Sequence, residues 1–323
     1  MANSAELLMC RLFDMILNIL RKVGCMKVDD IKKVAVIGAG TMGSQIAEIL
    51  ARVGSYETHM VDVSDELVSN GLKAIDERLE RYFVSKGTLT AEEKKATLDR
   101  IKCSTSIEEA VKDVDFVIEV VVENLGVKKD VFKKLDASAP QHAILVSNTS
   151  GLNITEMGAV TSRPDKVVGM HFFYPVAIMS LVEVVRGAHT SDEVVQFACE
   201  LSRHLGKEPV VCKDVSYGFL ANRVYGRMTG EAVQMVWERV ASPEDIDKAV
   251  KLGYNLPIGP LELADIIGAW GLTAWAEEDR IRELGPDKGR LHPLVRAMIR
   301  AGYRGGKGKK GIYDFWNDVL SKW

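Results

Sequence analysis

The sequence predicts an α/β protein with a mostly parallel sheet in its N-terminal part, followed by an all-α C-terminal part. Apolar, β-branched runs alternate with helical stretches from residue 31 to residue 150, and this order is typical of a parallel sheet with crossover helices. Short apolar runs continue to residue 214, and beyond it every segment has helical periodicity with Gly and Pro between segments. A length of 323 residues is enough for about two domains.

The predicted sheet begins with a strand–helix–strand unit. VAVIG (34–38) predicts a buried strand, the apolar stripe within 46–53 predicts a helix, and HMVD (59–62) predicts the second strand. Residues 64–114 are polar with a helical period and are interrupted at 86–87, which predicts a helical hairpin.

Five further runs predict strands. DFVIEVV (115–121) and AILVSNTS (143–150) are the next buried runs. VVGMHFF (167–173), SLVEVVRG (180–187) and EPVVCKD (208–214) follow as short strands at close spacing. In the helical part, SPED (242–245) predicts a helix start, since it supplies an N-cap serine, a proline at the first helical position and an acid three residues after the cap.

We therefore expect three segments: an N-terminal extension (1–30), an α/β domain (31–213) and a helical domain (214–323). In the extension, the apolar stretch 7–20 is interrupted by charged and polar residues, so it is too short for a membrane-spanning helix and unlike a signal peptide. Met26 is an alternative start of the chain.

The composition excludes several classes of protein and partner. The chain has 42 Lys plus Arg against 45 Asp plus Glu, a net charge of −3, so no overall basic surface favours nucleic acid. Hydrophobic residues make up 47% and charged residues 27%, which excludes disorder as the main state. The five cysteines are scattered without a CxxC pair, which argues against a disulfide framework and a zinc site. We expect a cytoplasmic protein without a metal or a membrane anchor.

A glycine-rich motif lies between the first predicted strand and its helix. It consists of Gly38, Ala39, Gly40, Thr41, Met42 and Gly43. Such glycines allow a tight turn and close approach of a pyrophosphate to a helix N-terminus, which predicts a Rossmann-type dinucleotide site. Asp62 ends the second strand 22 residues after Gly40, where a carboxylate binds ribose hydroxyls and repels a 2′-phosphate, so NAD is favoured over NADP. The alternative is a turn without a ligand, with Asp62 as a strand-end cap.

Two other polar groups lie at predicted strand ends. His171 and Glu183 are 12 residues apart in two apolar runs, a spacing that allows adjacent strands to bring them together. An imidazole oriented by a carboxylate can accept an alcohol proton. From the residues alone, His171 could equally be a core histidine, and Ser150 a turn cap.

Several segments carry a resemblance to a known family. They are GAGTMG, VIEVVVENLGVKKDVFKKLD, SNTSGLNITE, HFFYPVAIMSLVEVVRG, GFLANR, SPEDIDKAVKLG and GPLELADIIG, in this order. From Ile31 to Phe315 the chain resembles the L-3-hydroxyacyl-CoA dehydrogenases (3-hydroxybutyryl-CoA dehydrogenases). The resemblance implies NAD-linked, reversible oxidation of an L-3-hydroxyacyl-CoA, in fatty-acid β-oxidation or butanoate-type metabolism, by a homodimer that associates through its helical domain.

The resemblance also implies roles for individual residues. His171 matches the general base, and Glu183 matches the carboxylate that orients it. Ser150 and Asn222 match groups that position the substrate. The expected cofactor contacts beyond the glycine motif and Asp62 are Glu123, Lys128 and Lys307.

The chain departs from the family pattern at three places. Tyr174 stands where HFFNP has asparagine, Gly151 where SNTSS has serine, and residues 216–218 differ from a threonine–proline–glycine run. A serine expected near Arg78 to contact CoA is not evident, and Arg78 and Lys86 are either charges for anionic phosphates or part of a solvated helix face.

Other functions remain open from the sequence. L-Gulonate 3-dehydrogenase and its lens crystallin relatives have a similar HFF region and act on a free hydroxy acid. A non-catalytic dinucleotide-binding protein is a second alternative. The β-hydroxyacid dehydrogenases would require a catalytic lysine where this chain has Asn222 and Arg223.

Overall fold

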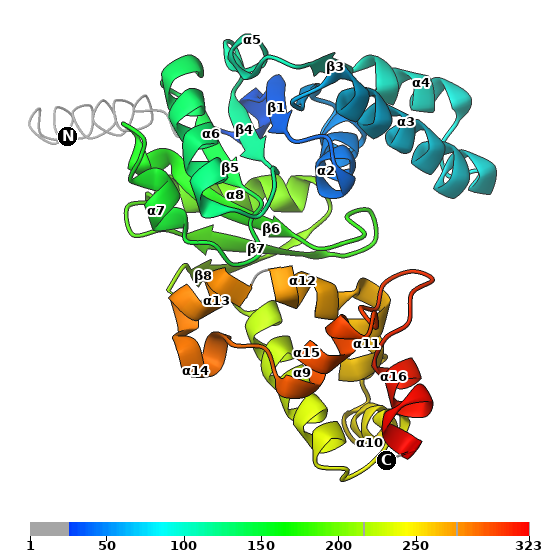
Figure 1. The fold of residues 1–323 in the computed structure, drawn as a ribbon. Helices are drawn as coiled ribbons and strands as arrows, with labels where there is room; N and C mark the ends of the chain where they lie inside the picture. Colours follow the sequence, from blue (N-terminus) through cyan, green and yellow to red (C-terminus); the bar gives the residue numbers. More distant parts are fainter. Residues whose placement is uncertain (1–25, 216, 276, 323) are drawn as a thin grey trace, which may run out of the picture. The chain divides into compact units, whose positions relative to one another are not determined.

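The computed structural model describes residues 26–215, 217–275 and 277–322. These residues divide into two compact units that meet between Asp214 and Val215 (Figure 1). Most of the predicted N-terminal extension, residues 1–25, lies outside the described residues. Its described end contains a short 3-10 helix, η1 (Val28–Asp30), and Val28 packs in the core of the first unit. Within the described ranges, no helix has both the length and the apolar character needed to cross a membrane.

The first unit is built on one sheet, in the strand order β3-β2-β1-β4-β5-β6-β7-β8. The strands are β1 (Lys33–Ile37), β2 (Glu57–Val61), β3 (Ile101–Ser104), β4 (Phe116–Glu119), β5 (Ile144–Ser147), β6 (Val167–Phe172), β7 (Leu181–Arg186) and β8 (Glu208–Lys213). All neighbouring pairs are parallel except β6 and β7. The predicted mostly parallel sheet is therefore confirmed.

Helices connect the strands, and side-chain caps mark where many of them begin. They are α2 (Thr41–Arg52), α3 (Asp65–Tyr82), α4 (Ala91–Asp99), α5 (Ile107–Val111), α6 (Leu125–Ser138), α7 (Ile154–Gly158) and α8 (Asp192–His204), with 3-10 turns η2 (Val84–Lys86) and η3 (Pro164–Lys166). Ser64 and Ser191 accept hydrogen bonds from the first turns of α3 and α8, and Thr90 forms a capping box with Glu93 at α4. Such caps satisfy backbone N–H groups that the helix itself leaves unpaired.

Two parts of the first unit differ from the sequence prediction. The predicted hairpin over 64–114 contains α3 and α4, but it is followed by strand β3 and helix α5. Strand β3 is a short edge strand in which only Ile101 is buried, so it has no apolar run that would indicate a strand. Helix α8, between β7 and β8, was not predicted either, although its buried positions have helical spacing.

The sheet has a reversal of strand order beside β1. From β1 the chain proceeds through β2 to β3 on one side, and then through β4 to the remaining strands on the other. In such open sheets, ligands bind at the carboxyl ends of the strands where the order reverses. The core beneath it is apolar: alternate residues of β1 and β4, among them Val36 and Ile118, pack against α2, α3 and α8.

Helices are the only regular elements in the described part of the second unit, which confirms the predicted all-α C-terminal region. It contains α9 (Ala221–Trp237), α10 (Pro243–Tyr254), α11 (Pro260–Ile267), α12 (Ala269–Trp275), α13 (Glu277–Leu284), α14 (Pro286–Gly289), α15 (Pro293–Arg300), α16 (Ile312–Asp318) and the 3-10 turn η4 (Leu320–Lys322). As predicted, Ser242 caps α10 by accepting from the Asp245 N–H, and Pro243 occupies the first turn. Its core is separate and includes Leu261, Leu294 and Ile312.

Candidate active site

An imidazole–carboxylate pair lies on the only antiparallel strand pair of the described sheet. His171 of β6 and Glu183 of β7 are direct register partners, and His171 Nδ1 lies 2.7 Å from Glu183 Oε2. The predicted contact between these side chains is thereby confirmed. Both are buried, with 4% and 1% of their surface exposed, so the pair interacts in a medium of low polarity. A carboxylate at Nδ1 holds the neutral imidazole in the tautomer whose basic nitrogen is Nε2.

The glycine-rich loop at the carboxyl end of β1 has the geometry that a dinucleotide requires. Gly38 has a φ of +116°, and a Cβ there would lie 2.5 Å from the carbonyl oxygen of Val120. A Cβ on Gly43 would lie 1.8 Å from the carbonyl oxygen of Gly38, which explains the close packing of α2 on the loop. A Cβ on Gly40, by contrast, would meet no atom within 4 Å. The open space in front of Gly40 is where a pyrophosphate would approach the α2 N-terminus.

Asp62, directly after β2, contacts this loop. Its Oδ2 accepts a hydrogen bond of 2.8 Å from the Ala39 N–H, and its Oδ1 accepts one of 2.7 Å from the Val63 N–H. The carboxylate is therefore a structural acceptor for the loop as well as a candidate ribose ligand. Thr41 is exposed at the first position of α2, and Met42 is half-buried.

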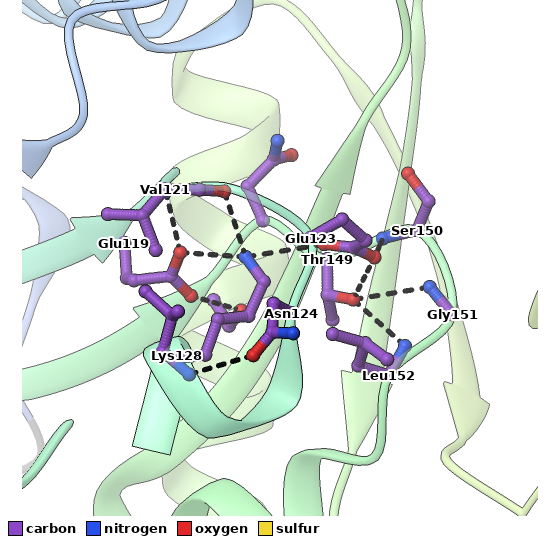
Figure 2. Close-up of polar contacts among 12 residues, drawn as sticks. Glu119, Val121, Glu123, Asn124, Lys128, Thr149, Ser150, Gly151 and Leu152 are labelled. Carbon is purple, nitrogen blue, oxygen red and sulfur yellow. Dashed lines mark hydrogen bonds and ion pairs between the residues drawn. The ribbon is translucent and has the colours of Figure 1, made fainter. Parts of the chain in front are cut away.

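The candidate substrate residue Ser150 lies on the loop that follows β5. Its N–H donates to Glu123 Oε1 over 2.8 Å, and the neighbouring Thr149 hydroxyl donates to the same oxygen over 2.5 Å. The Thr149 oxygen also accepts from the N–H groups of Gly151 and Leu152. Figure 2 shows these contacts, with the Ser150 hydroxyl directed away from them. Glu123, a predicted cofactor contact, thus orders the loop that carries Ser150.

Lys128, the other predicted cofactor contact in this region, is fully buried on α6. Its Nζ lies 2.7 Å from Glu119 Oε1 and 3.3 Å from Glu123 Oε2. Burial by itself would lower the pKa of Lys128, but the carboxylates of Glu119 and Glu123 outweigh it and raise that pKa above its ordinary value. The ammonium group is therefore held in its charged form. It is itself buried, and its ion pair with the partly exposed Glu123 connects it to the surface of the site.

The loop between β6 and β7 is held by two side chains from distant elements. Gln45 of α2 accepts from the Val176 N–H over 2.9 Å. Lys207 Nζ donates to the carbonyl oxygens of Val176 and Met179. Tyr174, which replaces the family's asparagine, is 62% exposed on this loop.

The two candidate phosphate-binding cations differ in their surroundings. Arg78 Nε donates to Glu48 Oε2 over 2.6 Å, and Glu48 is buried, so this edge of the guanidinium is held in an internal ion pair, while its buried Nη2 has no hydrogen-bond partner among the described residues. Lys86 is exposed at η2, with its Nζ 5.8 Å from the ring centroid of Tyr82. The structure thus favours a structural role for Arg78 over phosphate binding.

The remaining predicted residues belong to the second unit. Asn222 is exposed in the first turn of α9. Lys307 is exposed on the glycine-rich loop between α15 and α16. That loop is anchored by Asp265, whose main-chain oxygen accepts from the Gly306 N–H and whose Oδ1 accepts from the Ile312 N–H.

Sequence reasoning missed several polar residues of the first unit. They are Glu119, Thr149, Gln45 and Lys207. Glu119 had a usable signal, because a carboxylate inside the apolar run DFVIEVV needs a partner once the strand is buried. Gln45 and Lys207 had none, since their partners include backbone groups of a distant loop, and the bond of Thr149 to the Glu123 carboxylate joins residues 26 apart in sequence.

Comparisons with known proteins agree with this geometry. The family model for the NAD binding domain of 3-hydroxyacyl-CoA dehydrogenase matches residues 33–215, and the model for its C-terminal domain matches residues 218–315. A probable 3-hydroxybutyryl-CoA dehydrogenase of Bacillus subtilis (strain 168) is 45% identical over 286 residues, covering 88% of this chain and 98% of that protein. The 3-hydroxybutyryl-CoA dehydrogenase of Clostridioides difficile is 42% identical, covering 88% and 99%.

A solved structure is similar to this chain over residues of both units. The crystal structure of (S)-3-hydroxybutyryl-CoA dehydrogenase from Ralstonia eutropha aligns with a TM-score of 0.80 and 43% sequence identity, covering 88% of this chain and 98% of that one. The resemblance noted from the sequence is confirmed. With both family models matched in order and the relatives aligned over nearly their full length, the chain belongs to the 3-hydroxyacyl-CoA dehydrogenase family, and its first unit contains the NAD binding domain of that family.

Proposed function

We propose that this protein oxidises the 3-hydroxyl group of an L-3-hydroxyacyl-CoA to a 3-oxoacyl-CoA with NAD, reversibly. The observation that carries the proposal is the buried pair of His171 and Glu183 in the same sheet as a glycine-rich loop that fits a dinucleotide. A base held in one tautomer and a hydride acceptor are the two components that alcohol oxidation requires.

His171 acts as the general base in this proposal. Its Nε2 takes the hydroxyl proton, and Glu183 stabilises the imidazolium that forms. In the reverse direction the same imidazolium returns the proton to the alkoxide. Ser150 and Asn222 orient the hydroxyl or the acyl carbonyl. NAD, when bound, supplies the hydride acceptor.

The cofactor residues are those around the α2 N-terminus and the neighbouring strand ends. Gly38, Gly40, Thr41, Met42 and Gly43 would hold the pyrophosphate through backbone groups. Asp62 would receive the adenosine ribose hydroxyls, and its charge favours NAD over NADP. We further assign contacts to Glu123, Lys128 and Lys307, with Lys128 acting from its buried position through Glu123.

We assign cofactor binding to residues 31–213, and substrate binding and dimerisation to residues 214–323. Large apolar side chains exposed on the second unit support a homodimer: Val224, Leu252, Tyr254, Ile266 and Leu272 are each 58% to 79% exposed. In the proposed dimer, these side chains are candidates for the interface. Fatty-acid β-oxidation or butanoate-type metabolism in the cytoplasm is the setting that we propose.

The direct test is the rate of NADH formation with L-3-hydroxyacyl-CoA substrates of graded length, and of NADH consumption with acetoacetyl-CoA. The relatives are named for 3-hydroxybutyryl-CoA, so the four-carbon substrate is tested first. Turnover of L-gulonate without turnover of any acyl-CoA would contradict the proposal and favour the free hydroxy acid. NADH binding without any turnover would indicate a non-catalytic protein.

A further inference from the structure

A buried chain of charges connects the end of β4 to the loop that carries Ser150. It consists of Glu119, Lys128 and Glu123, in this order, and we call it the carboxylate–lysine chain. Glu119 and Lys128 have 0% of their surface exposed, whereas the Glu123 side chain is 27% exposed. Figure 2 shows the three side chains beside the loops after β4 and β5. Only the last member can touch a ligand.

Glu119 is anchored on all sides. It pairs in register with Ser147 across β4 and β5. Its Oε2 accepts from the Ser147 hydroxyl over 2.7 Å, and its Oε1 accepts from the Val121 N–H and from Lys128 Nζ, each over 2.7 Å. Three donors around one buried carboxylate fix its position.

Lys128 connects the fixed carboxylate of Glu119 to the carboxylate of Glu123. Its Nζ lies between the two carboxylates, at 2.7 Å from Glu119 Oε1 and 3.3 Å from Glu123 Oε2. Glu119 at the end of β4 and Glu123 in the following loop are the charged groups that act on Lys128. The hydroxyl of Ser147 in β5 donates to Glu119, and that of Thr149 in the loop after β5 donates to Glu123. Without Glu119, the ammonium would be a buried charge with two longer contacts, to Glu123 Oε2 at 3.3 Å and to the Val121 carbonyl oxygen at 3.4 Å.

Glu123 in turn holds the two loops at the ligand-binding edge. Its Oε1 accepts from the Thr149 hydroxyl and the Ser150 N–H. The same β4 loop packs on the glycine-rich loop, because the Val120 N–H donates to Ile37 O over 2.7 Å and Val120 O lies against Gly38. A shift of Glu123 would therefore displace both Ser150 and the floor of the dinucleotide site.

We propose that Glu119 is a positioning residue of this enzyme: it holds Lys128, and through it Glu123, so that the Ser150 loop and the nicotinamide side of the cofactor site keep one geometry. Glu119 touches neither substrate nor cofactor. The inference rests on the proposed function for the role of Ser150, but its effect on cofactor affinity does not require turnover.

The test compares three variants of the full chain. Glu119→Gln removes the buried negative charge and leaves that of Lys128. The double variant Glu119→Gln/Lys128→Met removes both charges of this buried ion pair. Glu156→Gln is the matched control, because it breaks the partly exposed ion pair with Lys129, the next residue of the same helix. Each variant is measured for melting temperature, NADH affinity, kcat and KM with the acyl-CoA substrate, and the pH dependence of kcat.

For Glu119→Gln we expect a lower melting temperature, NADH affinity about 10-fold weaker and kcat about 100-fold lower, as a misplaced reacting group causes. An alkaline fall in kcat should appear that the wild type lacks, because burial then dominates the pKa of Lys128 and the ammonium loses its proton at lower pH. The double variant should recover melting temperature, since no buried charge is left unpaired, but not kcat or NADH affinity. Glu156→Gln should resemble the wild type.

Recovery of kcat together with melting temperature in the double variant would overturn the proposal, because Glu119 would then only balance charge. A Glu119→Gln protein whose kcat and NADH affinity equal those of the control Glu156→Gln would also overturn the proposal. If Glu119→Gln does not fold, the test uses Glu119→Asp, which keeps the charge but shortens the side chain. A lower kcat with a wild-type pH profile would support the positioning role of Glu119, and an unchanged kcat would refute it. If the wild type turns over no acyl-CoA, the proposed function fails, while NADH titration of Glu119→Gln against Glu156→Gln still tests this inference.

Discussion

His171 and Glu183 face each other from register-matched positions of two antiparallel strands, with Nδ1 of one 2.7 Å from Oε2 of the other. The ring of Phe173 lies against the imidazole, with 4.4 Å between ring centroids. The register of β6 and β7 fixes the backbones of the two residues opposite each other, and the burial of both side chains restricts their rotation. The pair is thus positioned by backbone pairing rather than by a mobile loop, which is favourable for a catalytic group.

Glu183→Gln should lower kcat for oxidation far more than it lowers NAD affinity. The amide keeps the size of the side chain but removes the charge that stabilises the imidazolium. We expect a loss of about 100-fold or more in kcat, typical of a disabled general base, and a shift of the acid limb of the pH–rate profile to lower pH. Steady-state kinetics between pH 6 and pH 10 measure both effects. A variant with an unchanged pH profile would make Glu183 a structural strand residue.

The two residues should also behave as one unit. His171→Gln should reduce kcat more than Glu183→Gln, and the double variant should cost little more than His171→Gln alone, because residues of one catalytic unit are not additive. The double-mutant cycle on kcat/KM tests this. Fully additive losses would contradict the pairing.

Gly40→Ala should weaken NAD binding without destabilising the fold, whereas Gly43→Ala should destabilise the fold. A methyl group at Gly40 meets open space, so the fold should keep its free energy of unfolding to within about 0.5 kcal/mol while the KM for NAD rises, because the methyl group occupies the approach of the pyrophosphate. A methyl group at Gly43 would collide with the Gly38 carbonyl, so that variant should be destabilised. Chemical denaturation and NAD titration separate the two. Normal NAD affinity in Gly40→Ala would place the dinucleotide elsewhere.

Asp62→Ala should weaken NAD more than NADP, because it removes hydrogen bonds to the ribose and also removes a repulsion of the 2′-phosphate. The affinity for both dinucleotides should fall somewhat, because the Ala39 N–H in the glycine-rich loop loses its acceptor. Asp62→Asn is the matched variant, as it keeps an oxygen for Ala39 without the charge. Titration of both dinucleotides gives the ratio. If the wild type and both variants have the same ratio of NAD affinity to NADP affinity, Asp62 serves only as the hydrogen-bond acceptor that holds the glycine-rich loop.

Gln45→Ala should lower the free energy of unfolding by about 1–3 kcal/mol, because the buried N–H of Val176 loses its acceptor. Gln45 also donates to Thr41 O over 3.0 Å, so the variant should raise the KM for NAD as the glycine-rich loop loosens. Gln196→Ala is the control, since that glutamine is exposed on α8 and donates to the side chain of Glu200. Equal stability of the two variants would show that the loop is held by Lys207 alone.

Cys212 makes a contribution to stability that depends on pH. Burial, with smaller effects of Glu183 and Asp214, raises the pKa of the Cys212 thiol from 9.0 to about 11. The unfolded thiol ionises first as the pH rises, so its contribution is complete below pH 9 and is lost between pH 9 and pH 11. Melting temperatures of the wild type should therefore fall more steeply over this interval than those of Cys212→Ala. Parallel curves would contradict the assigned pKa.

The sequence by itself determined the fold class and the glycine-rich loop, and it placed His171 and Glu183 in two apolar runs 12 residues apart, whereas the role of His171 as a base came from the family resemblance. These features depend on local patterns: β-branched runs that can only be buried strands, glycines at positions that exclude a Cβ, and an N-cap serine before a proline. The same local reasoning failed at β3, because an edge strand with one buried residue has no distinguishing pattern. The family resemblance added the roles of Ser150 and Glu123, which no periodicity indicates.

Only the tertiary structure decided how these residues are held. The contacts of Glu119 with Ser147, of Gln45 with Val176 and of Asp62 with Ala39 join elements that are 23 to 131 residues apart in sequence. A hydrogen bond between such groups depends on strand register and loop path, neither of which leaves a mark on the local sequence. Lys128 illustrates the difference. Its charge is evident in the sequence, but its complete burial between two carboxylates exists only in the folded chain.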